Sequence, residues 1–213
     1  CLFDDSQLKT IGKEAFADSV IERFTISHHL TEICELAFYS CRQLNRLDIP
    51  NNSELNKIGC GAFSYTGIER FMIPHHLKII SERMFLSSKL KRVDVPRESE
   101  LEAIEEKAFY LTPIERFTIP RNVTSIGKEA FYMCDNLQEV VIEDGSELRV
   151  IGKSAFSCTK IEKFTIPPKV DQIEESSFAS DNLKVIEMNA NPELEKIVKD
   201  ALGRPDDVEI KII

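Results

Sequence analysis

The stretch IERFTIP occupies residues 114–120, and its first six residues recur as IERFTI at 21–26, IERFMI at 68–73 and IEKFTI at 161–166. A phenylalanine precedes each copy by five residues, and the same residue marks the intervening units. The steps between these phenylalanines are 22, 25, 22, 24, 22, 25 and 22 residues. Such a period indicates stacked repeats. The phenylalanines are Phe16, Phe38, Phe63, Phe85, Phe109, Phe131, Phe156 and Phe178.

Each unit contains a short strand pattern after its phenylalanine. In one unit the apolar residues are Ile114, Phe117 and Ile119, and the last two alternate as in a strand with one buried face. Pro120 follows directly, as a proline follows five of the eight patterns, and proline ends a strand. One unit cannot bury its apolar side alone, so the units must stack around a shared core that holds a column of phenylalanines.

The sequence therefore predicts a curved, right-handed leucine-rich repeat solenoid. We expect a parallel sheet along its concave side and short strands, turns or 3₁₀ pieces on its convex side. Residues 1–213 are predicted to form one domain, with about eight repeats in 1–188 and a helix–strand cap in 189–213. Residues 1–16 align with 141–156, which predicts a truncated first repeat and a longer natural array.

Two segments carry a family resemblance. IPRNVTSIGKEAFYMCDNLQEVVIE at 119–143 and IGKSAFSCTKIEKFTIPPKV at 151–170 resemble the BspA-like class of leucine-rich repeats, and the resemblance covers residues 1 to about 190. Proteins of this class are mostly surface proteins of host-associated bacteria and parasitic protozoa, and the founding member is an adhesin for extracellular matrix protein. The resemblance implies a surface interaction protein, with no catalytic motif and no defined adhesive residue to transfer.

One outward column of the predicted sheet is rich in cations, although the net charge of the chain is −9. Stacked like charges repel unless acids neutralise them, so one interpretation is a self-neutralised face whose arginine stems cover the strands. The alternative is a stripe that binds an acidic protein or a sulfated glycan, because the guanidinium fork suits carboxylate and sulfate. The candidate partner-binding residues are Arg23, Arg46, Arg70, Met72, Arg92, Arg116 and Lys163.

Histidine, cysteine and asparagine residues give weaker indications of metal, disulfide and glycosylation sites. The pairs His28–His29 and His75–His76 lie in turns, without a cysteine or carboxylate cluster at ligand spacing, so we expect solvated side chains and no metal site. Cys41, Cys134 and Cys158 are expected to be small core residues, and Cys34 with Cys60 is the one plausible disulfide pair. Asn51 and Asn122 begin glycosylation sequons in predicted turns.

The sequence argues against several functions. The acidic balance argues against nucleic-acid binding, and no apolar run is long enough to insert into a membrane. GKS at 152–154 lacks the glycine that a phosphate-binding loop needs five residues earlier, where Glu147 stands. No arrangement of a nucleophile and a base is evident. We therefore expect no cofactor and no enzymatic activity.

The preferred hypothesis is non-enzymatic recognition at a cell surface, or after secretion, of a protein partner such as a host extracellular matrix or cell-surface protein. Repeat arrays present broad faces suited to this role. One alternative is an intracellular, cytoplasmic scaffold or enzyme inhibitor of leucine-rich type. A second alternative is a structural stalk that carries another domain.

Overall fold

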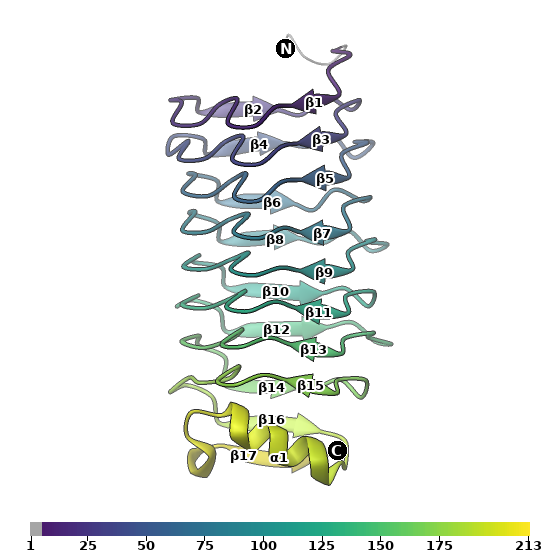
Figure 1. Cartoon of the computed structure of the whole chain (residues 1–213), viewed down its shortest axis with the longest axis vertical. Coiled ribbons are helices and arrows are strands. Elements are labelled where there is room, and N and C mark those ends of the chain that lie inside the picture. Colours follow the sequence, from purple (N-terminus) through teal and green to yellow (C-terminus); the bar gives the residue numbers. More distant parts are fainter. Residues whose placement is uncertain (1–5) are drawn as a thin grey trace.

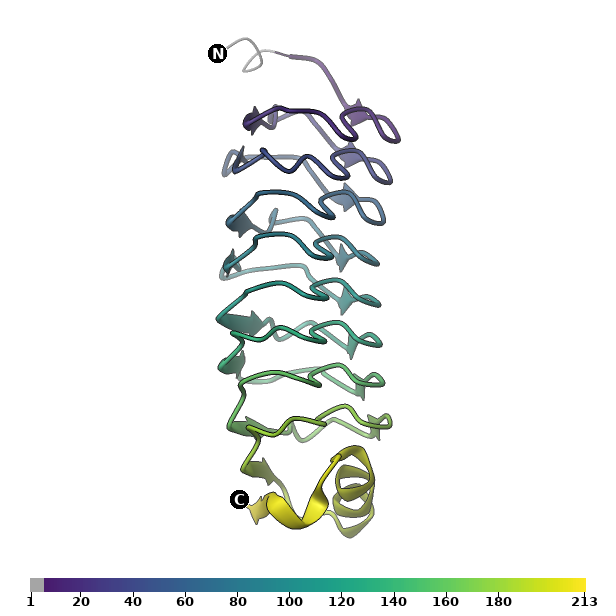
Figure 2. The same cartoon turned by 90° about the vertical axis from the view of Figure 1, so that its left-hand side faces the viewer.

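The computed structural model describes residues 6–213, which wind into turns stacked along one nearly straight axis (Figures 1 and 2). Each turn contributes one strand to each of two opposite sides. The longer strands are β2 (Arg23–Thr25), β4 (Arg46–Asp48), β6 (Arg70–Met72), β8 (Arg92–Asp94), β10 (Arg116–Ile119), β12 (Glu139–Ile142), β14 (Lys163–Thr165) and β16 (Val185–Met188). The two-residue strands are β1 (Thr10–Ile11), β3 (Glu32–Ile33), β5 (Lys57–Ile58), β7 (Ile79–Ile80), β9 (Ala103–Ile104), β11 (Ser125–Ile126), β13 (Val150–Ile151) and β15 (Gln172–Ile173).

All strand pairs are parallel, and their register matches equivalent repeat positions. Phe117 lies opposite Val140, and Arg92 lies opposite both Arg70 and Arg116. Among the strands of residues 6–213, the longer side divides into three hydrogen-bonded groups, β2-β4, β6-β8-β10-β12 and β14-β16 with the terminal strand β17 (Glu209–Ile212). The hydrogen bonding of the sheet is therefore interrupted between β4 and β6 and between β12 and β14. We call the outer surface of these longer strands the sheet face.

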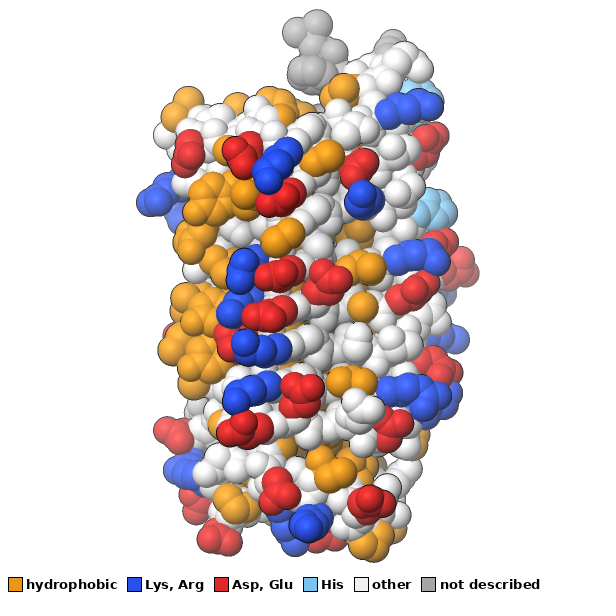
Figure 3. Space-filling view, in the orientation of Figure 1, with side chains coloured by type: hydrophobic (Ala, Val, Ile, Leu, Met, Phe, Trp, Pro, Cys, Tyr) orange, Lys and Arg blue, Asp and Glu red, His pale blue; other side chains and the backbone are white. Residues whose placement is uncertain are grey.

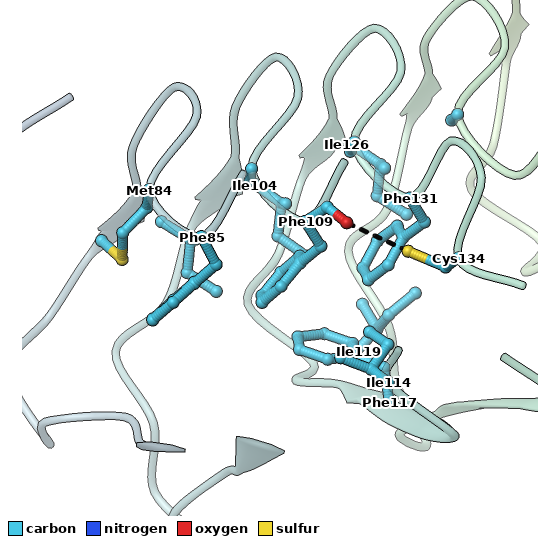
Figure 4. Packing of buried hydrophobic residues seen from close by; sticks show 14 of the residues in the cluster. Met84, Phe85, Ile104, Phe109, Ile114, Phe117, Ile119, Ile126, Phe131 and Cys134 are labelled. Atoms are coloured by element: carbon cyan, nitrogen blue, oxygen red, sulfur yellow. Dashed lines mark hydrogen bonds between the residues drawn. The ribbon is translucent and has the colours of Figure 1, made fainter. Parts of the chain in front are cut away.

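The repeat phenylalanines form a continuous column inside the stack. Neighbouring rings from Phe16 to Phe178 lie nearly parallel, with centroids 5.0–5.8 Å apart. Phe117 packs against this column from β10, with its ring centroid 5.2 Å from those of both Phe109 and Phe131 (Figure 4). The predicted phenylalanine column is present, and it occupies the centre of the apolar core.

The turns that carry the phenylalanines form a third ladder of backbone hydrogen bonds, between the two sides that carry the strands. In seven successive turns, the second residues before and after the phenylalanine have positive φ, as Lys107 (56°) and Leu111 (57°) do around Phe109. This bends the chain so that the Phe109 N–H donates to the Ala130 carbonyl of the next turn, at 2.8 Å. The same bond recurs along the stack, and it satisfies backbone groups that would otherwise be buried without a partner.

A helix and a strand close the C-terminal end (Figure 2). The α1 helix (Pro192–Ala201) begins with a proline after Asn191, whose side-chain oxygen accepts from the Leu194 N–H at 3.1 Å. Its buried face covers the last turn, and a 3₁₀ segment (Pro205–Asp207) leads into β17, which pairs with β16. The parallel solenoid and its helix–strand end, predicted from the sequence, are confirmed.

The cysteines correct one prediction. Cys41 and Cys134 are buried, and each thiol donates to a phenylalanine carbonyl of the preceding turn, Cys134 to Phe109 at 3.0 Å (Figure 4). Cys158 was expected in the core as well, but it is exposed, because its one-residue offset places it at the positive-φ position of its turn. The five cysteines that the structure places, including Cys34 and Cys60, are free.

Candidate functional site

The predicted column of cations lies on the sheet face, with one member on each of six of the eight longer strands. Strand register places Arg23 beside Arg46, and Arg92 between Arg70 and Arg116. The side chains of Arg46, Arg70, Arg92, Arg116 and Lys163 are more than half exposed. We call the six cationic positions the arginine column: Arg23, Arg46, Arg70, Arg92, Arg116 and Lys163.

Carboxylates pair with most of the arginine column. The Arg46 Nε donates to both oxygens of Asp48 at 2.8 Å, and Asp94 accepts from both Arg70 and Arg92. Arg116 pairs with Glu139 at 3.3 Å, and Lys163 pairs with Glu187 at 2.8 Å. Within residues 6–213, Arg23 is the member without an ion pair. The acids reduce the repulsion between stacked cations, and the arginines of the column make these contacts through Nε.

Met72 lies where the sheet is interrupted between β4 and β6. An open hollow of about 370 Å³ there is lined by Arg46, Leu47, Asp48, Arg70 and Met72, among others. A second hollow, of about 640 Å³, lies at the interruption between β12 and β14, and Lys163 lines it. The candidate residues Arg46, Arg70 and Met72 therefore converge on one depression, whereas Lys163 belongs to another.

We expect Asp94→Asn to destabilise the fold by about 0.5–1 kcal/mol at pH 7, a range discounted for solvent screening. Burial raises the pKa of Asp94, but hydrogen bonds from Arg70 and Arg92 outweigh burial and hold the pKa below its ordinary value. A lowered folded-state pKa stabilises the fold above the unfolded pKa, near 4, and this stabilisation is lost as pH falls through the folded value.

Urea unfolding at pH 7 and pH 3 measures this effect. The difference between the native chain and Asp94→Asn should shrink at the lower pH. Asp48→Asn is the matched control, since Asp48 accepts from one arginine and its side chain is 44% exposed, against 20% for Asp94. An equal loss for both variants, independent of pH, would contradict the assigned role of Asp94.

A second surface runs along the turns that follow the repeat phenylalanines. Figure 3 shows hydrophobic side chains gathered along this edge, at the left of the view. Tyr39 and Tyr65 have ring centroids 5.5 Å apart, and Tyr110 and Tyr132 have theirs 5.3 Å apart. We call this surface the tyrosine edge: Tyr39, Tyr65, Leu86, Tyr110, Leu111, Tyr132 and Met133.

Three apolar members of the tyrosine edge occupy an unfavourable backbone conformation. Tyr65, Leu111 and Met133 have φ values of 59°, 57° and 56°, and their side chains remain exposed. Positive φ at this position recurs in seven turns and belongs to the repeat, so what distinguishes these three residues is an exposed apolar side chain there. Ser40 and Ser87 show that smaller residues occupy the same turn position elsewhere in the chain. The tyrosine edge was not predicted from the sequence, because its members lie one or two residues after a phenylalanine and do not recur in every unit.

The turns at the opposite edge hold the histidines and the sequons. Asn51 and Asn122 are exposed, and the Asn122 amide donates to the Ser99 carbonyl at 3.2 Å. His76 Nδ1 lies 3.0 Å from Glu100 Oε1, and His29 Nδ1 lies 3.6 Å from Glu54 Oε1. The sequence shows no cysteine or carboxylate cluster at ligand spacing beside the histidines, but the fold brings one carboxylate to each pair, because Glu54 and Glu100 come from the longer turn of the next repeat.

A family comparison accounts for the repeat. The model of the BspA type leucine-rich repeat region, with six copies, matches residues 9–103 and 102–209. This chain belongs to the BspA type leucine-rich repeat family. Membership agrees with the structure, since the strand and the phenylalanine turn recur at equivalent places throughout the stack, and a proline follows five of the eight strand patterns.

Solved structures share the fold of this BspA type chain. The pneumococcal vaccine antigen PcpA superposes with a TM-score of 0.60 at 15% identity, covering 97% of this chain and 85% of that one. A leucine-rich repeat protein from Bacteroides ovatus gives 0.54 at 22% identity, covering 97% and 70%. No curated protein matches the sequence. In residues 6–213, no helix has both the length and the apolar character needed to cross a membrane.

Proposed function

We propose that this BspA type chain is a non-enzymatic binding module, exposed at a cell surface or secreted, that contacts a protein partner through the tyrosine edge. The observation that carries the proposal is the row of aromatic and aliphatic side chains, of which Tyr65, Leu111 and Met133 are exposed and the others half-buried. Contiguous exposed apolar surface indicates an interaction site, and tyrosine is enriched among residues that dominate binding energy. The surface location is supported by the family and by the name of the similar protein PcpA, a vaccine antigen.

The arginine column is the second candidate surface, with an acidic protein or a sulfated glycan as its partner. Two features favour it: Arg23 has no acidic partner within residues 6–213, and Arg46, Arg70 and Met72 line one hollow. Its internal carboxylates weigh against it, since an anionic ligand must compete with Asp48 and Asp94 for the guanidinium groups. The tyrosine edge has no comparable competitor for an apolar partner.

Two variants separate these surfaces in an assay with purified extracellular matrix proteins, sulfated glycans and intact host cells. The edge variant carries Tyr65→Ser, Leu111→Ser and Met133→Ser, and Ser40 and Ser87 already occupy this turn position with positive φ. The sheet variant carries Arg46→Gln, Arg70→Gln, Arg92→Gln and Arg116→Gln, which removes charge and keeps length. Circular dichroism must first show that both variants fold as the native chain does.

We expect the edge variant to lose protein binding at least about tenfold, the effect of one strong interface residue, while the sheet variant keeps it. Loss in the sheet variant alone would overturn the tyrosine edge and assign binding to the arginine column. Absence of binding by the native chain would overturn the binding module and favour the stalk. If Asn51 and Asn122 carry no glycan and the native protein is found in the cytoplasm, the intracellular scaffold would instead be favoured.

A further inference from the structure

His75, His76 and Glu100 lie together at the edge opposite the tyrosine edge. Pro74 ends the strand pattern that includes β6, and the short turn after it presents the two histidines. The turn after β8 is two residues longer and presents Glu100, whose backbone N–H donates to the His75 carbonyl at 3.3 Å. The carboxylate thus comes from the neighbouring turn. Figure 3 shows histidine side chains along this edge, at the right of the view.

The side chains converge as well as the backbones. One ligand atom from each of His75, His76 and Glu100 lies within 4.8 Å of the other two. His76 Nδ1 is 3.0 Å from Glu100 Oε1, and the two imidazole centroids are 5.0 Å apart. In a tetrahedral zinc site, ligand atoms about 2.0–2.1 Å from the metal are about 3.4 Å from each other. Small rotations of these solvent-accessible side chains close the remaining gap.

We propose that His75, His76 and Glu100 form a surface site for Zn²⁺ that joins two neighbouring turns of the solenoid. Two imidazoles and a carboxylate are ligand types that zinc accepts, and three protein ligands leave a fourth position for water or for a group of a binding partner. The site lies away from the tyrosine edge and goes beyond the proposed function.

An ordinary ion pair between His76 and Glu100 is the competing explanation. It accounts for one contact but leaves the approach of His75 to both groups unexplained. In the related set of His28, His29 and Glu54, His29 Nδ1 lies 3.6 Å from Glu54 Oε1, and the His28 and His29 imidazole centroids are 3.9 Å apart. Within the part of the chain that the structure describes, three such ligand atoms converge at His75, His76 and Glu100 and not at the related set.

The two sets provide a matched experiment with Zn²⁺ alone as the probe. Calorimetric titration compares the native chain, the double variant His75→Ala with His76→Ala, the double variant His28→Ala with His29→Ala, and Glu100→Gln. Exposed thiols are alkylated beforehand in every sample, because Cys158 is accessible and thiolates also bind zinc. We expect the native chain to bind one Zn²⁺ ion and to unfold at a higher temperature with zinc than without it.

The variant at His75 and His76 should lose this binding, and the variant at His28 and His29 should keep it. Removing a residue that only hydrogen-bonds to a metal ligand lowers metal affinity about 10–100-fold. Glu100→Gln removes a direct ligand, so it should lower the affinity for Zn²⁺ at least as much. A second readout is side-chain NMR of the native chain, in which only the His75 and His76 imidazole signals should shift with zinc. Absence of binding by the native chain, equal loss in both double variants, or shifts confined to other histidines would overturn the proposal.

Discussion

Replacing Phe109 by alanine is expected to destabilise the solenoid by about 3–5 kcal/mol, the range for a large aromatic removed from a core. The Phe109 ring is fully buried, and its centroid lies 5.5 Å from that of Phe85 and 5.0 Å from that of Phe131. Ile114, Phe117 and Ile126 lie in the same packed region (Figure 4). The cavity therefore opens in the middle of the column, where the surrounding turns are held by their own hydrogen bonds and cannot collapse into it.

Denaturant unfolding, followed by circular dichroism, measures this loss. Tyr110→Ala is the control, because Tyr110 is the next residue of the same turn and its half-buried ring stacks on Tyr132 at the surface. The control should lose far less. Since each turn contacts only its neighbours, the variant chain is also expected to unfold in two steps, with the turns on either side of residue 109 separating. Equal losses for Phe109→Ala and Tyr110→Ala would refute this account of the column.

Replacing Gly127 by alanine is expected to cost about 1–3 kcal/mol, the range for overpacking a close contact. A Cβ at Gly127 would lie 2.7 Å from the Glu105 carbonyl carbon and 2.7 Å from the Glu106 nitrogen of the preceding turn. Both atoms belong to the backbone, so relief requires the turns to move apart. That movement would weaken the hydrogen bond from the Gly127 N–H to the Ile104 carbonyl, now 2.7 Å.

Gly12 offers a matched control for Gly127→Ala. It stands four residues before its phenylalanine, as Gly127 does, but among the residues that the structure places, no heavy atom lies within 4 Å of a Cβ built there. Gly12→Ala should leave the thermal unfolding midpoint unchanged or raise it slightly, because alanine restricts the unfolded chain more than glycine does. A similar fall for both variants would show that backbone contact between turns is not the cause.

The fold was predictable because its determinants are periodic. Every phenylalanine of the column and every strand such as Arg116–Ile119 recurs at a nearly fixed interval, and the burial of one side of each unit follows from stacking. The helix that begins at Pro192 was also predictable, since Asn191 is a favourable N-cap residue and proline is favoured at the first helical position. Cys158 was misplaced because a shift of one residue within a tight turn reverses the direction of a side chain.

The surface was less predictable, because it depends on which residues of different turns meet. The column position of Arg70 follows from the repeat, but its sharing of Asp94 with Arg92 depends on side-chain geometry. Glu100 lies beside His76 because the longer turn displaces it toward the preceding repeat. Tyr65 and Leu111 were missed because the residue at this positive-φ position differs from turn to turn and shows no periodic apolar pattern.

The ladder of hydrogen bonds between phenylalanine turns also has a kinetic consequence. Each bond joins residues about one turn apart along the chain, as Phe109 and Ala130 are, and no closure of a long loop is needed at any point in the stack. Folding rate depends on the separation of contacting residues, and in this architecture that separation stays constant while the array lengthens. A solenoid built in this way can gain turns without folding more slowly, as each new turn docks on an ordered template.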